Sequence, residues 1–209
     1  KTAHESIPHI STISYNASAD MNVQEEIVSS LICTQRRLPK RVSLRDYNYR
    51  KPSLEIKGEA VVDEQGQGTV TIYGEHFKTP GEGNALATTR AEGLQSREKT
   101  YHGECTAPNM SSGFLFTLND HYREGFNQEY LITAVNHHGS QSAFLPSDSQ
   151  PAGAQQSAGG EYGNSFSCIP SNQQFRPRQV HSKTRFYGMM NAKVDASGDG
   201  RFAEIDDQG

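Results

Sequence analysis

The chain has 209 residues, of which 33% are hydrophobic and none is tryptophan, and its formal net charge is −4. This length suits one large or two small domains. The low hydrophobic content favours a β-rich protein with long polar loops, or a subunit that completes its burial against partners, over a self-sufficient enzyme core. Charges of both signs are mixed along the chain, which argues against nucleic acid as a partner. No apolar run approaches the roughly 20 residues of a membrane helix, so we expect no stable membrane insertion.

The first regular element of the chain is ambiguous. Residues 1 to about 20 are polar and irregular, and the segment 23–33 follows them. It places Ile27, Val28 and Leu31 on one helical face, but short apolar runs of this kind also form strands. Both interpretations stay open at this point.

Three strands are predicted next, because apolar and polar residues alternate over 42–47, 54–61 and 69–74. The link 63–68 between the second and third strands contains the glycines that a hairpin turn requires. The sequence therefore predicts a β-hairpin at this link.

One principal helix is predicted over about 84–100, where no proline interrupts the chain and Asn84 can serve as the N-cap. Gly93 lowers the propensity of this helix by roughly 1 kcal/mol relative to alanine. Strand character returns in the segments that follow. These segments are 101–106, 112–118, 129–138 and 161–169.

The segment 147–160 is the clearest loop, because its Ser, Gly, Ala, Gln and Pro residues offer no core-forming side chain. Such a composition cannot bury enough apolar surface to offset the entropy of ordering, so we expect a mobile excursion. A connector opens at 175–177 and leads to another segment at 186–194.

Cys33, Cys105 and Cys168 are widely spaced and form no CxxC motif, which fits unpaired thiols in a reducing compartment. His102 and Cys105 have a ligand-like spacing, but a zinc site needs four ligands, usually in tight pairs. The segment 195–206 imitates a calcium loop, but its last position is Asp instead of Glu, and a β-hairpin is the favoured interpretation. We expect no bound metal and no cofactor.

Asp120 and His121 could form a general-base pair, with His102, His137 and His138 near them in the strand order. No nucleophile elbow accompanies the pair. The favoured interpretation is that these residues satisfy backbone groups at strand ends, and we expect no enzymatic activity.

The run from Leu118 to Gln141 has the pattern L-x-D-H-x-R-x-x-F-N-x-x-Y-L-I-T-x-V-x-H-H-G-x-Q. This pattern resembles the hub region of the VgrG (valine-glycine repeat protein G) family of type VI secretion spike proteins, which are related to the hub proteins of contractile phage tails. Further elements of the family follow the same order at 46–52, 86–92, 175–177 and 192–209. The resemblance covers most of the chain from about Val42.

The resemblance implies a mainly β fold, with an antiparallel barrel-like phage-tail-hub domain and one principal helix at about 84–100. It also implies an N-terminal segment of a hub subdomain at 1–40 and a barrel-like domain at 41–146. The hub domain and its connector would end within 161–182, after the loop, and a small OB-type barrel would begin within 183–209. The residues that match the family motif are expected to be structural. They are Arg90, Glu92, Asp120, His121, Arg123, Asn127, Tyr130, His137, Arg176 and Pro177.

The resemblance implies a structural hub of the secretion spike, with no catalysis. Expected partners are two further copies in a homotrimer of the intact protein, a hexameric tube protein, baseplate components and effector proteins. Expected localisation is the bacterial cytoplasm during assembly, followed by secretion or delivery into a target cell. The alternative is a cell-wall glycan-degrading domain attached to such a hub. That alternative needs a carboxylate pair, for which Glu104, Asp120 and Glu129 are the candidates.

The chain does not begin with methionine and ends directly after an alternating stretch, so we expect a fragment of a longer protein. The valine-glycine needle of the family is absent from this sequence. Much of the family's trimer contact comes from such parts. We therefore expect the chain alone to be monomeric, or in a monomer–trimer equilibrium, at micromolar concentration.

Overall fold

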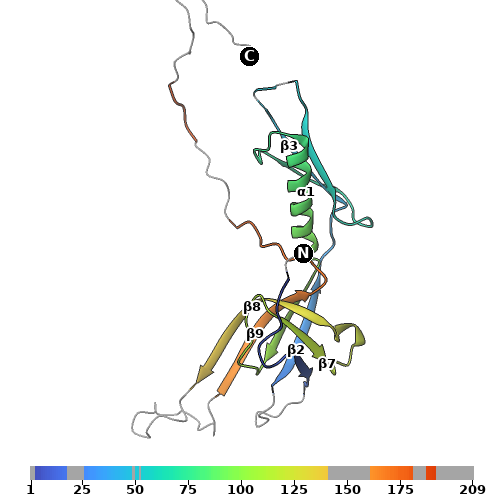
Figure 1. Cartoon of the computed structure of the whole chain (residues 1–209), viewed down its shortest axis with the longest axis vertical. Helices are drawn as coiled ribbons and strands as arrows, with labels where there is room; N and C mark the ends of the chain where they lie inside the picture. The colour runs from blue at the N-terminus through green and yellow to red at the C-terminus, as the bar shows by residue number, and fades with distance from the viewer. Residues whose placement is uncertain are drawn as a thin grey trace, which may run out of the picture. The chain divides into compact units, whose positions relative to one another are not determined.

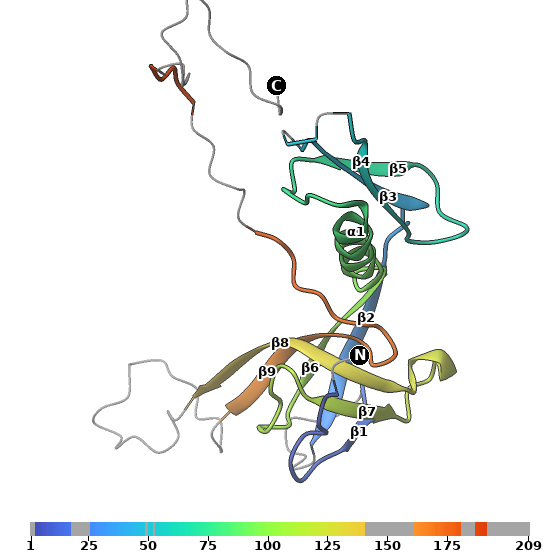
Figure 2. The same ribbon diagram turned by 45° about the horizontal axis from the view of Figure 1, so that its top comes forward.

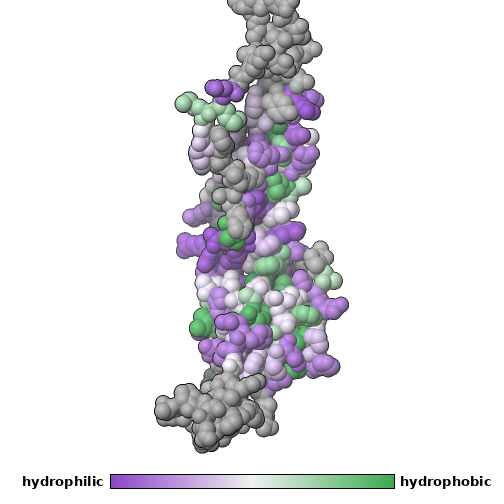
Figure 3. Space-filling model, turned by 90° about the vertical axis from the view of Figure 1, so that its left-hand side faces the viewer, coloured by the Kyte–Doolittle hydropathy of each residue, from purple (hydrophilic) through white to green (hydrophobic). Residues whose placement is uncertain are grey.

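Nine strands, one α-helix and one short 3-10 helix form the regular structure of the residues described by the computed structural model, which are 3–17, 26–48, 50–51, 53–140, 161–180 and 187–191. The chain divides into two units (Figure 1). The barrel unit comprises Lys1–Arg37 and Gln95–Phe175, and the sheet–helix unit comprises Leu38–Leu94 and Arg176–Gly209. On the face shown in Figure 3, hydrophobic residues lie scattered among hydrophilic ones, in keeping with the composition.

The barrel unit is a closed barrel in the strand order β1-β2-β6-β9-β8-β7 (Figure 2). Neighbouring strands run antiparallel, except that β1 is parallel to both β2 and β7. The prediction of an antiparallel barrel is therefore confirmed apart from this one strand. Its strands are β1 (Thr12–Tyr15), β2 (Ile27–Gln35), β6 (Lys99–Cys105), β7 (Leu115–Asn119), β8 (Glu129–Ser140) and β9 (Glu161–Pro170).

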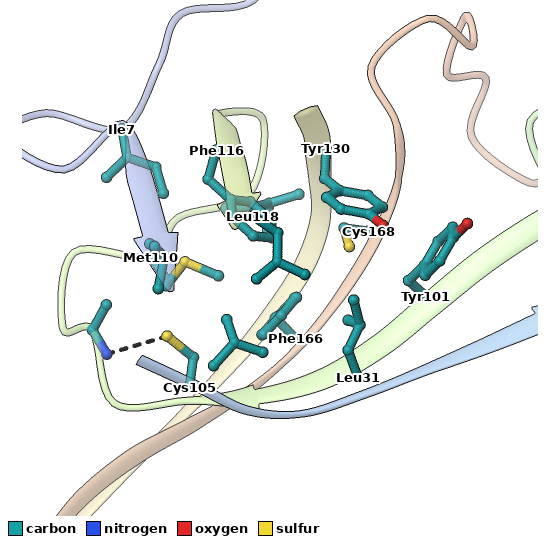
Figure 4. Close-up of a cluster of buried hydrophobic side chains, with 14 residues drawn as sticks. Ile7, Leu31, Tyr101, Cys105, Met110, Phe116, Leu118, Tyr130, Phe166 and Cys168 are labelled. Atoms are coloured by element: carbon teal, nitrogen blue, oxygen red, sulfur yellow. Dashed lines mark hydrogen bonds between the residues drawn. The ribbon is translucent and has the colours of Figure 1, made fainter. Parts of the chain in front are cut away.

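Every second side chain of a strand points into the barrel interior, because successive side chains of a strand point to opposite faces. In β6, for example, Tyr101, Gly103 and Cys105 are buried while their neighbours are more exposed. Phe116 and Tyr130 are the largest fully buried side chains and stack with ring centroids 5.5 Å apart (Figure 4). A Cβ atom at Gly103 would lie 2.6 Å from the Phe166 ring, so only glycine admits that ring here.

The sheet–helix unit contains the strands β3 (Arg41–Asp46), β4 (Ile56–Val61) and β5 (Thr69–Tyr73), and the helix α1 (Pro80–Gln95). The strand order is β4-β3-β5, and α1 lies along one face of this sheet (Figure 2). Their shared core consists of apolar side chains from the sheet, the helix and the chain between them. These residues are Val42, Leu44, Ile56, Val62, Phe77, Ala87 and Ala91.

The predicted hairpin at 63–68 is wrong, because β3 lies between β4 and β5. The link instead crosses one end of β3, where Val62 N donates to Lys40 O at 2.9 Å and Lys40 N donates to Gly68 O at 2.9 Å. A Cβ atom at Gly66 would lie 2.6 Å from the carbonyl oxygen of Pro39. Glycine is thus needed for the close crossing, and the same residue type had suggested a tight turn.

The predicted helix is confirmed as the principal helix, but it begins four residues earlier than expected. Thr79 precedes it, its Oγ1 accepts from Glu82 N at 3.3 Å, and Pro80 occupies the first turn, where a missing N–H costs nothing. Asn84 is not the N-cap, since its side chain accepts from Glu59 N in β4 at 3.1 Å. Ser96 and Arg97 form a turn, and Lys99 already belongs to β6.

The ambiguous segment 23–33 resolves as strand β2 from Ile27 onward. The remaining predicted strands are confirmed with shifts of a few residues at their ends. Three predictions lie outside the described residues: the loop at 147–160, the hairpin at 195–206 and most of the OB-type segment at 183–209. The linear domain boundaries stay a prediction. None of the described helical residues forms a segment long and apolar enough to cross a bilayer.

Candidate functional site

The segment 120–128 joins β7 to β8, and we call it the β7–β8 corner. It contains four of the ten family-motif residues, namely Asp120, His121, Arg123 and Asn127. Asp120 has a φ of 63°, a left-handed conformation that Asp tolerates better than most residues, and this turns the chain out of β7. His121 N donates to Asn127 Oδ1 at 2.8 Å, and Asn127 Nδ2 donates back to His121 O at 3.0 Å. Asn127 therefore closes the corner with a reciprocal pair of hydrogen bonds.

His121 is the buried centre of the corner, with only 4% of its surface exposed. Its ring lies 4.4 Å from the Tyr122 ring, 4.6 Å from Phe126 and 4.2 Å from Tyr15 of β1. Arg123 N donates to Nδ1 at 3.0 Å, so the neutral ring carries its proton on Nε2. Burial lowers the pKa of His121, and the nearby Arg123 charge acts in the same direction.

Tyr130, the first motif residue of β8, ties the strand to the corner. Its hydroxyl donates to Phe126 O at 2.8 Å and accepts from Gln128 Nε2 at 3.2 Å. Burial raises the pKa of Tyr130 above its ordinary value, and it raises the pKa of Tyr101 to about 12. Both phenols therefore stay neutral and act as hydrogen-bonding groups of the core.

This geometry does not support the general-base alternative. A general base needs a free ring nitrogen within reach of a substrate proton. Nδ1 of His121 is occupied by a backbone N–H, and Nε2 is buried without a hydrogen-bond partner among the described residues. Because aromatic rings surround the imidazole, its role in the corner is to pack against them.

The two motif residues on α1 form ion pairs with loops of the sheet–helix unit. Arg90 Nη2 lies 2.8 Å from Glu75 Oε2, just after β5. Glu92 Oε2 lies 2.7 Å from both Nε and Nη2 of Arg176, a residue 84 positions away in the sequence. Two elements of the family motif, 86–92 and 175–177, thus meet at one helix, while Pro177, next to Arg176, is exposed in an irregular segment.

The histidines that were considered beside the Asp120–His121 pair do not gather into one site. His137 Nδ1 lies 2.6 Å from the hydroxyl of Tyr162, whereas His102 Nδ1 lies 2.9 Å from Ser167 Oγ. The side chain of His138 faces Gly163, where an added Cβ atom would lie 2.8 Å from its Nε2. His102 and His138 therefore contact the residues directly opposite them in β9, whereas His137 contacts the diagonal neighbour Tyr162.

His102 and Cys105, which have a ligand-like spacing in the sequence, are also separated, since His102 is exposed and Cys105 is buried on the opposite face of β6. Cys105 Sγ accepts from Ala107 N at 3.2 Å, and burial raises the pKa of this thiol to about 11. No group of three potential metal ligands occurs among the described residues.

The carboxylates named for the glycan-degrading alternative are not all adjacent. Glu104 aligns through Ser165 with Asn136, which lies seven residues along β8 from Glu129. Seven residues of strand span about 23 Å, well beyond the roughly 5–10 Å between the carboxylates of glycosidases. Glu104 therefore cannot form a catalytic pair with Glu129.

Two partners of the motif residues were missed by the sequence analysis, namely Glu75, which binds Arg90, and Tyr15, which packs on His121. Neither position carries a local signal, because each residue acquires its role only when distant segments meet. The sequence did mark Asn127 and Tyr130, but not the hydrogen bonds that they make.

Comparisons with known proteins agree with this architecture. Two solved phage-type tail proteins share the fold: a 43 kDa tail protein of prophage MuSo2 from Shewanella oneidensis and a tail protein from Neisseria meningitidis MC58. Their TM-scores are 0.51 and 0.52, at 12% and 6% identity, over 79% and 78% of this chain and 44% of each of those chains.

Curated relatives come from type VI secretion. The chain is 31% identical to the spike protein VgrG5 of Pseudomonas aeruginosa over 74% of its length, and 26% identical to the actin cross-linking toxin VgrG1 of Vibrio cholerae over 87%. It spans only 20% and 16% of the length of these relatives. The sequence profile of the phage tail baseplate hub (GPD) family matches residues 1–143. The chain therefore belongs to the phage tail baseplate hub family, and its relatives include the VgrG spike proteins.

Proposed function

We propose that this chain is the structural hub part of a type VI secretion spike, which trimerises in the intact protein and docks on a hexameric tube for the contractile delivery of effectors. The observation that carries the proposal is the match of the hub family to residues 1–143, which contain most of a closed barrel and its β7–β8 corner. The type VI context is supported by the 31% identity to VgrG5.

A non-catalytic role fits the geometry of the residues that match the family motif. The residues Asp120, His121, Asn127 and Tyr130 hold one end of the barrel together, and Arg90 and Glu92 fasten loops to α1. All of these contacts stabilise the fold, and none presents a reactive group to a substrate. We infer that the motif residues stabilise the fold of a structural subunit.

The low hydrophobic content of the sequence bears on how strongly the chain alone would associate. Obligate interfaces bury on the order of 2,000 Å² or more and are rich in apolar residues. Most of the buried hydrophobic side chains among the described residues lie in two internal cores, while others, such as Ile32 and Tyr73, are exposed. A smaller interface contributes less to association, but the translational and rotational entropy lost on association stays the same. We therefore expect the chain alone to be a monomer or to exchange with a trimer at micromolar concentration.

The proposed localisation follows from the proposed machine. The hub would assemble in the bacterial cytoplasm with the tube and the baseplate, and contraction would then secrete it or deliver it into a target cell. Effector proteins would travel with the intact spike.

Docking on the tube is tested by comparing the chain alone with the same chain fused to a trimeric coiled coil. The fusion supplies the association that the isolated chain lacks and raises its avidity for a symmetric partner. We expect the fused trimer to co-elute with a hexameric tube protein of type VI secretion. The coiled coil alone serves as the control. A fused trimer that leaves the tube protein unbound, or a chain that forms a stable dimer in sedimentation equilibrium, would contradict the proposal.

A further inference from the structure

A hollow of about 350 Å³ opens in the sheet–helix unit, within the size range of ligand sites. It lies at the end of the sheet where β3 and β5 finish. These strands are parallel, so the loops that follow them meet at one edge. One wall comes from the loop after β3, with Tyr47, Lys51 and Leu54, and the other from the segment after β5, with His76 and Lys78.

The hollow carries a local excess of positive charge. Arg50, Lys51 and Lys78 line it, and Asp46 is the only carboxylate among the described residues of its lining. Both oxygens of Asp46 accept backbone N–H groups, Oδ1 from Tyr47 at 2.8 Å and Oδ2 from His76. The exposed Lys51 and Lys78 form no ion pair among the described residues. This excess contrasts with the net charge of −4 of the whole chain.

The hollow also exposes apolar surface between its cations. Tyr47 is 58% exposed and Leu54 is 41% exposed, beside the buried Phe77. Tyrosine and arginine, which both line the hollow, are enriched among the binding hot spots of protein interfaces. A partner that fits must therefore combine negative charge with an apolar side chain.

We propose that this hollow binds an acidic peptide segment of a partner protein. Its carboxylates pair with Lys51 and Lys78, and an apolar side chain packs between Tyr47 and Leu54. An inorganic anion would leave the apolar surface unused, and a long nucleic acid would meet the net negative charge of the rest of the chain. The helix start contributes little, since Thr79 and Glu82 already accept the N–H groups of Glu82 and Lys78.

The binding is tested with the whole chain and a fluorescein-labelled peptide in which aspartate and glutamate flank a leucine and a phenylalanine. Fluorescence anisotropy at low salt gives the affinity. We expect the acidic peptide to bind at least about ten-fold more tightly than the same peptide with asparagine and glutamine, a difference of about 1.4 kcal/mol. Equal binding of the two peptides, no binding of the acidic one, or stronger binding of a single-stranded DNA oligonucleotide would overturn the proposal.

Variants locate the site. The double substitution Lys51→Glu with Lys78→Glu should weaken peptide binding by at least about ten-fold, because it turns two attractions into repulsions. Tyr47→Ala should weaken it by about five-fold through lost packing. The control is Lys99→Glu. Lys99 is an exposed lysine of the barrel unit, so this variant reverses one positive charge outside the hollow. Far-UV circular dichroism establishes that each variant is folded. An equal loss of binding in Lys99→Glu would show that net charge alone attracts the peptide and would sink the proposal.

Discussion

The β7–β8 corner of the barrel and the ion pairs of α1 both contain family-motif residues, but different interactions stabilise them. The corner is closed by hydrogen bonds within a shell of aromatic rings, and His121 is almost fully buried. The Arg176 and Glu92 side chains are 42% and 30% exposed, so water and salt screen their attraction. We therefore expect the motif residues to differ in what they contribute to stability, with the buried ones contributing more.

The largest expected effect lies in the barrel. Tyr130→Ala should lower the free energy of unfolding by about 3–5 kcal/mol, because it leaves a cavity beside Phe116 and breaks the bond to Phe126 O. Tyr130→Phe keeps the ring and should cost only about 1 kcal/mol. Urea unfolding followed by circular dichroism measures both. Hydrogen exchange of peptides from β8 and β3 then shows whether the loss is confined to the barrel unit. Similar costs for the two variants would mean that the hydroxyl, and not the ring, holds β8 in place.

The next effect concerns the closure of the corner. Asn127→Ala removes both hydrogen bonds to the His121 backbone and should cost about 1–3 kcal/mol, since those groups are partly buried. Asn127→Asp retains the acceptor for His121 N but loses the donor to His121 O, and it should fall between the alanine variant and the wild type. The measurement is again urea unfolding. If alanine at this position costs less than the loss of the Glu92 ion pair, the corner is not the better-stabilised region.

The ion pairs of α1 should respond according to their exposure. Arg90→Ala leaves the largely buried Glu75 carboxylate without this charge partner and should cost about 1–3 kcal/mol. Glu92→Gln breaks the more exposed pair with Arg176 and should cost at most about 1 kcal/mol. Unfolding in low and high NaCl separates the two, because screening should reduce the effect of Glu92→Gln more than that of Arg90→Ala. The reverse order in salt would contradict the assignment by exposure.

The smallest effect is a dependence on pH. The pKa of His121 lies below its ordinary value of 6.5 in the folded protein, so the unfolded chain binds this proton more readily. The stability that follows is fully present above about pH 6.5 and is lost as the pH falls from there through the folded-state pKa.

His121→Asn should flatten this decline, measured as the free energy of unfolding between neutral and mildly acidic pH. The control is His76→Asn, an exposed residue with a φ of 63° that asparagine tolerates. The control variant should keep the decline of the wild type. A decline that is unchanged in His121→Asn would show that other groups cause it.

Several features could be predicted from the sequence because they depend on neighbours in the chain. The alternation over 42–47 and 69–74 predicts strands, and both segments are strands, although Val42, Ser43 and Leu44 of β3 are all buried and most of β5 is exposed. The motif around Asp120 marks a polar corner, because a chain that leaves β7 needs side chains to satisfy its backbone. The absence of proline and the many helix-compatible residues between 84 and 95 likewise mark α1.

Only the tertiary structure decided which segments meet. The glycines of 63–68 are compatible with a hairpin and with a strand crossing, and the order β4-β3-β5 depends on which strands pair with β3. The partners of Arg90, Glu92 and His121 are likewise set by contacts between distant segments. Alternation reports only which face of a strand is buried, whereas strand pairing and ion pairing depend on chain closure over long separations. For that reason the sequence determined the elements and the motif of this hub protein, and the folded structure decided their partners.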